Sequence, residues 1–140
     1  MSITTHEELI AKVPLFQGLS KRDLRRVARH LRERTFQPGE DIVDEGRGSG
    51  AFFLITAGKA KVKVGNRTQA TLKPGDYFGE MSIIDRKPRS ATVEAETTVR
   101  TLSLTSTSLL GLLEDHFTIS RRVMEALSDR IRKLQSSTSH

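Results

Sequence analysis

The chain has 140 residues, a formal net charge of +6 and no cysteine. This length gives room for one domain with its own hydrophobic core, and the absence of cysteine excludes disulfides, thiolate metal sites and cysteine nucleophiles. Because no apolar run approaches the ~20 residues of a membrane-spanning helix and the N-terminus lacks the regions of a secretory signal, we expect a soluble, cytoplasmic protein.

The first part of the chain has helical periodicity. Apolar residues recur at helical spacing in residues 6–13, and Pro14 ends that pattern. Ser20 stands where an N-cap belongs, directly before residues 21–31, whose apolar side chains fall on one face. The pattern predicts two helices that cover another part of the protein.

The middle part, about residues 34–104, reads as short strands separated by turns. Residues 51–58 form a short apolar run, and residues 59–72 alternate around Gly65-Asn66, a dipeptide typical of hairpin turns. The alternation predicts that Ala60, Val62 and Val64 point inward. Strands at this spacing indicate a small antiparallel barrel or jelly roll.

The last part is helical again, over residues 105–116 and 117–135. Phe117, Met124 and Ile131 are seven residues apart, and leucines follow the last two after three residues. This seam of two to three heptads fits either packing on the chain's own domain or a dimer contact. We expect residues 136–140 to be a disordered tail.

Several functions have no support in the residues. The four histidines lie in helical or terminal segments, so the strand region lacks a metal site or a Ser-His-Asp triad of the usual kind. The glycine-rich residues 46–50 lack the lysine and the helix of a P-loop. We therefore expect no metal, no cofactor and no enzymatic activity. The basic stretches 21–34 and 121–133 are either solvated helix faces or a surface for polyanions.

The segment FGEMSIIDRKPRSATVEA, residues 78–95, combines a glycine, one acid and one arginine around a short helical turn. Arg89 has the planar fork that suits two phosphate oxygens, and the Ser90 hydroxyl and the backbone N–H near Ala91 can add donors. Phosphate would repel Glu80, which suits the hydroxyls of a sugar such as the ribose 2′-OH. On these residues alone, Glu80 and Arg89 could simply form an ion pair.

This segment resembles the phosphate-binding cassette of cyclic-nucleotide-binding domains. The match is gapless over Phe78, Gly79, Glu80, Met81 and Ser82 and over residues 88–93, and similarity extends to residues 13–20, 38–40 and 44–62, about 120 residues in all. The resemblance implies a mainly β fold, an eight-stranded antiparallel β-roll with an N-terminal helical bundle and C-terminal B and C helices. It implies one domain over 1–135, with helices in 1–33, the roll in 34–104, the cassette in 78–93 and helices in 105–135.

The resemblance also implies roles for the site residues. Arg89, Ser90 and the N–H of Ala91 are expected to bind the cyclic phosphate, and Glu80 the ribose 2′-OH. The backbone around Gly79 and Ser82 completes the pocket, to which Phe78 and Met81 also belong. Val62 or Val64 is expected to lie against the base, with Arg130, Arg132 or residues 134–138 as further contacts.

The function implied is a stand-alone receptor for a cyclic nucleotide, with cAMP favoured over cGMP. In the family, threonine at the position of Ser90 is associated with guanine, and alanine with cAMP. The expected output is a rearrangement of the C-terminal helices that acts on a protein partner, or on a homodimer formed through residues 117–134. The alternatives are a cGMP-selective receptor, a scaffold that binds no nucleotide and a basic nucleic-acid-binding module. The resemblance favours neither nucleic acid nor membranes as partners.

Overall fold

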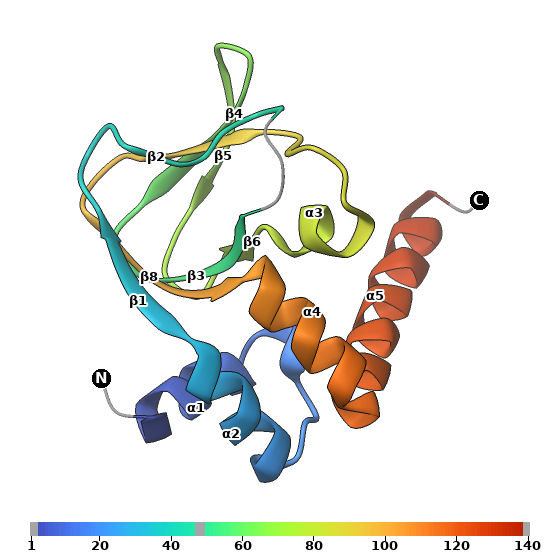
Figure 1. Cartoon of the computed structure of the whole chain (residues 1–140). Helices are drawn as coiled ribbons and strands as arrows, with labels where there is room; N and C mark the ends of the chain where they lie inside the picture. The colour runs from blue at the N-terminus through green and yellow to red at the C-terminus, as the bar shows by residue number, and fades with distance from the viewer. Residues whose placement is uncertain (1–2, 47–49, 139–140) are drawn as a thin grey trace. The chain divides into compact units, whose positions relative to one another are not determined.

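Two antiparallel sheets of four strands each form the middle of the chain (Figure 1). In the first sheet the order is β1 (Arg32–Phe36), β8 (Val99–Thr105), β3 (Ala51–Ala57) and β6 (Tyr77–Phe78). In the second it is β2 (Asp41–Val43), β7 (Thr92–Ala95), β4 (Ala60–Val64) and β5 (Arg67–Leu72). The eight strands confirm the predicted β-roll with flanking helices.

The computed structural model describes residues 3–46 and 50–138, so most of the glycine-rich stretch 46–50 lies outside the described residues. The chain divides into two compact units. One is the roll, His30–Leu110, and the other is helical and combines Met1–Arg29 with Gly111–His140.

The core of the roll is made by inward-facing side chains of both sheets. Phe53 on β3 lies at its centre, with its ring 5.4 Å from the stacked ring of Phe78 and 5.9 Å from the edge-on ring of Phe36. Alternating strand residues supply this core because successive side chains point to opposite faces of a sheet. The buried members are Phe36, Ile42, Ala51, Phe53, Ile55, Ala60, Val93, Ala95 and Val99.

The β4–β5 hairpin turns at Gly65-Asn66, as the sequence predicts, and Gly65 has a φ of 60°. Ala60 and Val62 pack into or against the core. Val64, however, is 38% exposed, so its predicted inward position is wrong. It pairs with Arg67 at the hairpin tip, beyond the reach of the core.

The helical unit contains α1 (Ile3–Ala11), the 3-10 turn η1 (Pro14–Phe16), α2 (Lys21–His30) and α5 (Phe117–Thr138). The last residue of α2, His30, belongs to the roll, and α4 (Ser106–Asp115) passes from the roll into the helical unit at Gly111. The Ser20 hydroxyl accepts a hydrogen bond from the N–H of Asp23, which confirms the predicted N-cap. The buried Asp23 carboxylate accepts hydrogen bonds from Arg26 and from Thr118 on α5. The Arg122 side chain donates to the carbonyl of Gln17, so α5 is tied to the N-terminal segment twice.

Helix α5 presents two different faces. Ile119 and Val123 are buried, whereas Phe117, Met124, Ile131 and Leu134 of the heptad seam are exposed. The helix continues to Thr138, so the prediction of a disordered tail is wrong for residues 136–138, and residues 139 and 140 lie outside the described residues. None of the helices in residues 3–46 and 50–138 is long and apolar enough to cross a membrane.

Candidate functional site

The segment between β6 and β7 has a short helix at its centre. Strand β6 ends at Phe78, Gly79 adopts a left-handed conformation with φ of 100°, and α3 spans Glu80–Asp85. Arg86, with φ of 59°, ends the helix, and the chain then returns to β7. This path brings both ends of the segment together, since the Arg89 side chain contacts the carbonyl of Gly79.

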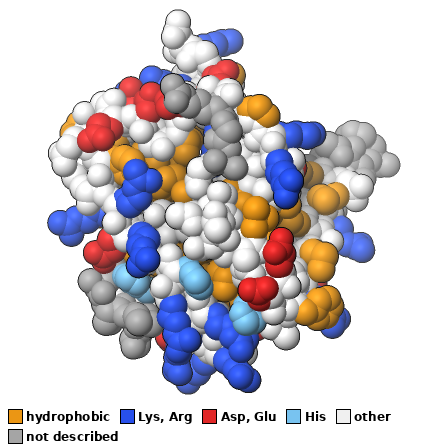
Figure 2. Space-filling model, viewed as in Figure 1, with side chains coloured by type: hydrophobic (Ala, Val, Ile, Leu, Met, Phe, Trp, Pro, Cys, Tyr) orange, Lys and Arg blue, Asp and Glu red, His pale blue; other side chains and the backbone are white. Residues whose placement is uncertain are grey.

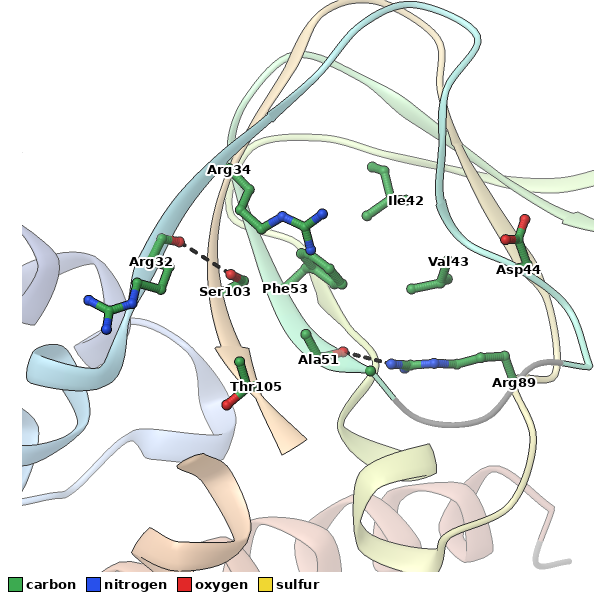
Figure 3. A pocket seen from close by; sticks show the side chains of 11 residues that line it. Arg32, Arg34, Ile42, Val43, Asp44, Ala51, Phe53, Arg89, Ser103 and Thr105 are labelled. Atoms are coloured by element: carbon green, nitrogen blue, oxygen red, sulfur yellow. Dashed lines mark hydrogen bonds between the residues drawn. The ribbon is translucent and has the colours of Figure 1, made fainter. Parts of the chain in front are cut away.

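Arg89 is a buried cation held by backbone oxygens. Arg89 is 6% exposed, and its Nη1 and Nη2 each donate a 2.8 Å hydrogen bond, to the carbonyls of Gly79 and Ala51 respectively. Figure 3 shows the bond to Ala51. The N–H of Gly46 donates to the Arg89 carbonyl at 2.8 Å, which fixes the backbone as well. A guanidinium has five N–H donors, so donors remain for a ligand.

The electrostatics of the site are set by burial and by one neighbouring acid. Burial lowers the pKa of Arg89, and the charge of Glu80 opposes this effect. Glu80 is itself only 5% exposed. A buried cation and a buried acid in one short segment are costly unless they are paired or hydrogen-bonded, so their positions are closely specified.

Gly79 is required by its neighbours as well as by its φ. A Cβ at this position would lie 2.4 Å from the carbonyl oxygen of Ala51 and 2.7 Å from Nη1 of Arg89. Both distances are below any normal contact, and a positive φ also disfavours a side chain. The absence of a side chain here lets the Arg89 guanidinium lie against the backbone.

A cavity of about 250 Å³ lies beside this segment. Its lining includes all nine site residues predicted from the sequence, and of the two valines predicted to lie against the base, Val62 and not Val64 lines it. The predicted residues are Val62, Phe78, Gly79, Glu80, Met81, Ser82, Arg89, Ser90 and Ala91.

Four lining residues were missed by the sequence analysis: Val43, Leu72, Tyr77 and Val93. Val43 pairs with Val93 across β2 and β7, and they add apolar wall to the cavity. Alternation in the strands marks such residues as inward-facing but does not show which of them border a cavity, because that depends on pairing between distant segments.

The lining of the cavity therefore combines polar and apolar residues. Arg89, Ser90 and Glu80 supply donors and an acceptor, and Val43, Val62, Leu72 and Val93 supply the wall. Such a site suits a ligand that joins an anionic group and hydroxyls to an apolar ring system. Arg130, Arg132 and Leu134 belong to the helical unit, and their contact with a ligand stays a prediction.

The chain matches the family model described as "Cyclic nucleotide-binding domain" over residues 33–116. It is 43% identical over 99 residues to a cyclic nucleotide-gated potassium channel of Mesorhizobium japonicum, covering 71% of this chain and 27% of the channel. It is 34% identical over 116 residues to a cAMP-dependent protein kinase regulatory subunit of Yarrowia lipolytica, covering 79% and 31%. The chain thus spans less than a third of the length of either relative.

A solved structure agrees with these matches. The crystal structure of the N-terminal domain of a transcriptional regulator from Streptomyces coelicolor A3(2) superimposes with a TM-score of 0.83 at 25% identity, covering 94% of this chain and 96% of that one. The family match spans most of the roll and the whole segment around Glu80 and Arg89. The chain therefore belongs to the cyclic nucleotide-binding domain family.

Proposed function

We propose that this protein is a receptor for cAMP that converts binding into a rearrangement of its C-terminal helices. The observation that carries the proposal is that Arg89 and Glu80, both buried, line one cavity with Ser90 and Ala91. The family is one of binding domains, and the proposed role is regulatory rather than catalytic.

The phosphate end of the ligand is assigned to Arg89. Its guanidinium is already oriented by the carbonyls of Gly79 and Ala51, so little side-chain entropy is lost when an anion binds. A cyclic phosphate carries one negative charge and two free oxygens, which a guanidinium edge can meet with parallel hydrogen bonds. Ser90 and the N–H of Ala91 are proposed as the further donors.

The sugar end is assigned to Glu80. A carboxylate only accepts hydrogen bonds, so it is suited to a ribose 2′-OH and unsuited to the phosphate. Its position at the start of α3, next to Gly79, places it in the same cavity as Arg89. This division of roles orients the nucleotide in one direction only.

The base is proposed to lie along the apolar wall that includes Val62 and Leu72. At about 250 Å³, the cavity is below the ~300–1,000 Å³ of sites for drug-sized ligands, so the base needs further cover. We assign that cover to α5, whose movement toward the bound base is the proposed signal. The preference for cAMP rests on the serine at position 90 and on the fungal relative named for cAMP.

The output is proposed to pass through the exposed seam of α5 to a second copy of the chain or to another protein. Phe117, Met124, Ile131 and Leu134 are all more than half exposed. Apolar side chains in such a row are costly in water and typical of contact surfaces.

The site is tested by measuring the binding of cAMP and of 2′-deoxy-cAMP, which lacks the ribose 2′-OH, to the wild type and to a Glu80 variant. We expect Glu80→Gln to weaken cAMP binding at least about tenfold, and 2′-deoxy-cAMP to bind the wild type about as weakly, because either change removes the same hydrogen bond. Combining both changes is expected to cost no more than either alone. Glu96→Gln, on the roll but outside the cavity lining, is the matched control. If the losses of binding free energy caused by Glu80→Gln and by 2′-deoxy-cAMP add up, the 2′-OH contacts a residue other than Glu80 and the assignment is wrong.

A further inference from the structure

The roll contains a second cavity, of about 340 Å³. The first cavity is lined mainly from β4, β5, β6 and the segment that leads to β7, whereas the second is lined mainly from β1, β2, β3 and β8. Among the described residues, Val43 and Arg89 line both. The lining residues of the second cavity are Arg32, Arg34, Ile42, Val43, Asp44, Gly50, Ala51, Phe53, Arg89, Ser103 and Thr105.

Arg34 is one of the cations that line this cavity. Its guanidinium carbon lies 5.0 Å from the centre of the Phe36 ring and 5.7 Å from that of Phe53, and in Figure 3 the group extends over Phe53 toward Ile42. The side chain of Arg32 points away from the cavity in the same view. Contact with two rings holds the Arg34 guanidinium in place, and its edge remains available for an anion.

The other walls are apolar or neutral. Ile42, Val43, Ala51 and Phe53 are core or core-packed residues, and hydrophobic side chains lie beside a basic one on this face of the roll (Figure 2). The buried Ser103 donates its hydroxyl proton to the carbonyl of Arg32 at 3.3 Å, so its oxygen can still accept. These surroundings suit a ligand that is mostly hydrocarbon.

The charges favour an anion with one negative charge. The side chain of Arg32 points away, so Arg34, Arg89 and Asp44 are the charged groups that face the cavity, and together they carry one net positive charge. Asp44 lies beyond Val43 from Arg34 in the close view (Figure 3). A carboxylate matches the single fork of Arg34, whereas a phosphate dianion would leave one charge uncompensated among apolar walls.

We propose that this second cavity binds a compact organic carboxylate, with its carboxylate on Arg34 and its hydrocarbon body on Phe53 and Ile42. The volume of about 340 Å³ is roughly twice that of a 150 Å³ cavity known to hold benzene, which fits one ring with its substituents. The site shares Val43 and Arg89 with the nucleotide cavity, but the proposal does not depend on the proposed function, because the carboxylate is assigned to Arg34.

The test uses benzoate as the probe and benzamide as its uncharged counterpart, with binding followed by backbone amide shifts in NMR. Benzoate is expected to bind saturably, to shift amides of β1, β2 and β3, and to bind at least about tenfold more weakly to Arg34→Gln. Arg67→Gln, an exposed arginine of β5 outside the lining, should leave binding unchanged. Benzamide should bind the wild type about as weakly as benzoate binds Arg34→Gln.

Unchanged benzoate affinity in Arg34→Gln would overturn the proposal, as would shifts confined to residues 79–91, which would place the probe in the nucleotide cavity. No saturable binding would also overturn it. The Arg34→Gln variant is expected to bind cAMP as the wild type does. If cAMP fails to bind the wild type while benzoate binds through Arg34, the proposed function fails and the second site stands.

Discussion

The Arg89 guanidinium donates a 2.8 Å hydrogen bond to the carbonyl of Ala51, 38 residues earlier in the chain. A second bond of equal length, to Gly79, closes the cassette on itself. Arg89 thus connects β3 with the segment before α3 and lines both cavities of the roll. The cation proposed to bind phosphate is a structural element in its own right, and its variants need to be examined for folding as well as for binding.

Gly79→Ala is expected to displace Arg89 and to weaken cAMP binding at least about tenfold. The new Cβ would meet Ala51 and Arg89 at 2.4 and 2.7 Å, in addition to the ~1–2 kcal/mol that a left-handed backbone costs a residue with a side chain. Gly75→Ala is the control, because Gly75 also has a positive φ but no atom within 4 Å of its Cβ position. Calorimetry and thermal melting of both variants separate the two effects. An equal loss of cAMP affinity in Gly79→Ala and Gly75→Ala would mean that the contact of the new Cβ with Arg89 has no effect on binding.

Thr118→Val is expected to destabilise the helical unit by about 1–3 kcal/mol. It removes the hydroxyl that donates to the buried Asp23 carboxylate and leaves that charge less well satisfied. Thr118→Ser keeps the donor and should remain close to the wild type. Urea unfolding curves measure both free energies. A Thr118→Val protein as stable as Thr118→Ser would show that this bond contributes nothing.

Asp41→Asn is expected to raise the melting temperature slightly at pH 7. Partial burial and a side-chain hydrogen bond with Asp44 raise the pKa of Asp41 above 3.8. The negative charges of Asp44 and Glu94 raise this pKa further, and the positive charge of Lys63 lowers it. A raised folded-state pKa means that the ionised form destabilises the fold, so stability is lost as pH rises through that pKa. The residue is exposed, so screening keeps the gain below about 1 kcal/mol.

This gain should shrink as the pH falls through the raised pKa and disappear below about 3.8, where Asp41 is neutral in both states. Melting temperatures of the two proteins between pH 3.5 and pH 7 (a range set by the ~3.9 reference pKa of Asp) provide the check. An Asp41→Asn protein that melts at a lower temperature than the wild type at pH 7 would contradict the prediction that ionised Asp41 destabilises the folded state.

Ile131→Glu is expected to shift the protein toward a monomer if α5 pairs with a second copy. A charge in the seam beside the exposed Met124 and Leu134 would have to be buried in such a contact. Lys133→Glu, also exposed on α5 but outside the seam, should leave assembly unchanged. Sedimentation velocity over a range of protein concentrations measures the fraction of dimer in the wild type and in both variants. A wild-type protein that stays monomeric throughout would leave another protein as the partner of the seam.

The cassette could be predicted from the sequence because its information is local. Gly79, Glu80 and Arg89 lie within eleven consecutive residues, and one turn of chain brings them into one cavity. The Gly65-Asn66 hairpin was predictable for the same reason. Each of these features depends on turn chemistry rather than on distant pairing.

Features that depend on distant pairing could not be predicted. The β1–β8 ladder joins residues such as Arg32 and Ser103, and the second cavity is lined by residues of that ladder together with residues of β2 and β3. Val64 continues the alternation of β4 past the end of the core, so the pattern placed it inside. The last turn of α5 is rich in serine and threonine, whose weak helix propensity gave no reason to extend the helix to Thr138.

The central claim is tested most directly by isothermal titration of the protein with cAMP and with cGMP, alongside Arg89→Ala. The account predicts binding on the order of micromolar or tighter, tighter for cAMP than for cGMP, and lost in an Arg89→Ala protein that thermal melting shows to be folded. Arg100→Ala, an exposed arginine of β8, should bind like the wild type. A folded wild-type protein that gives neither heat nor a thermal shift with either nucleotide would contradict the account.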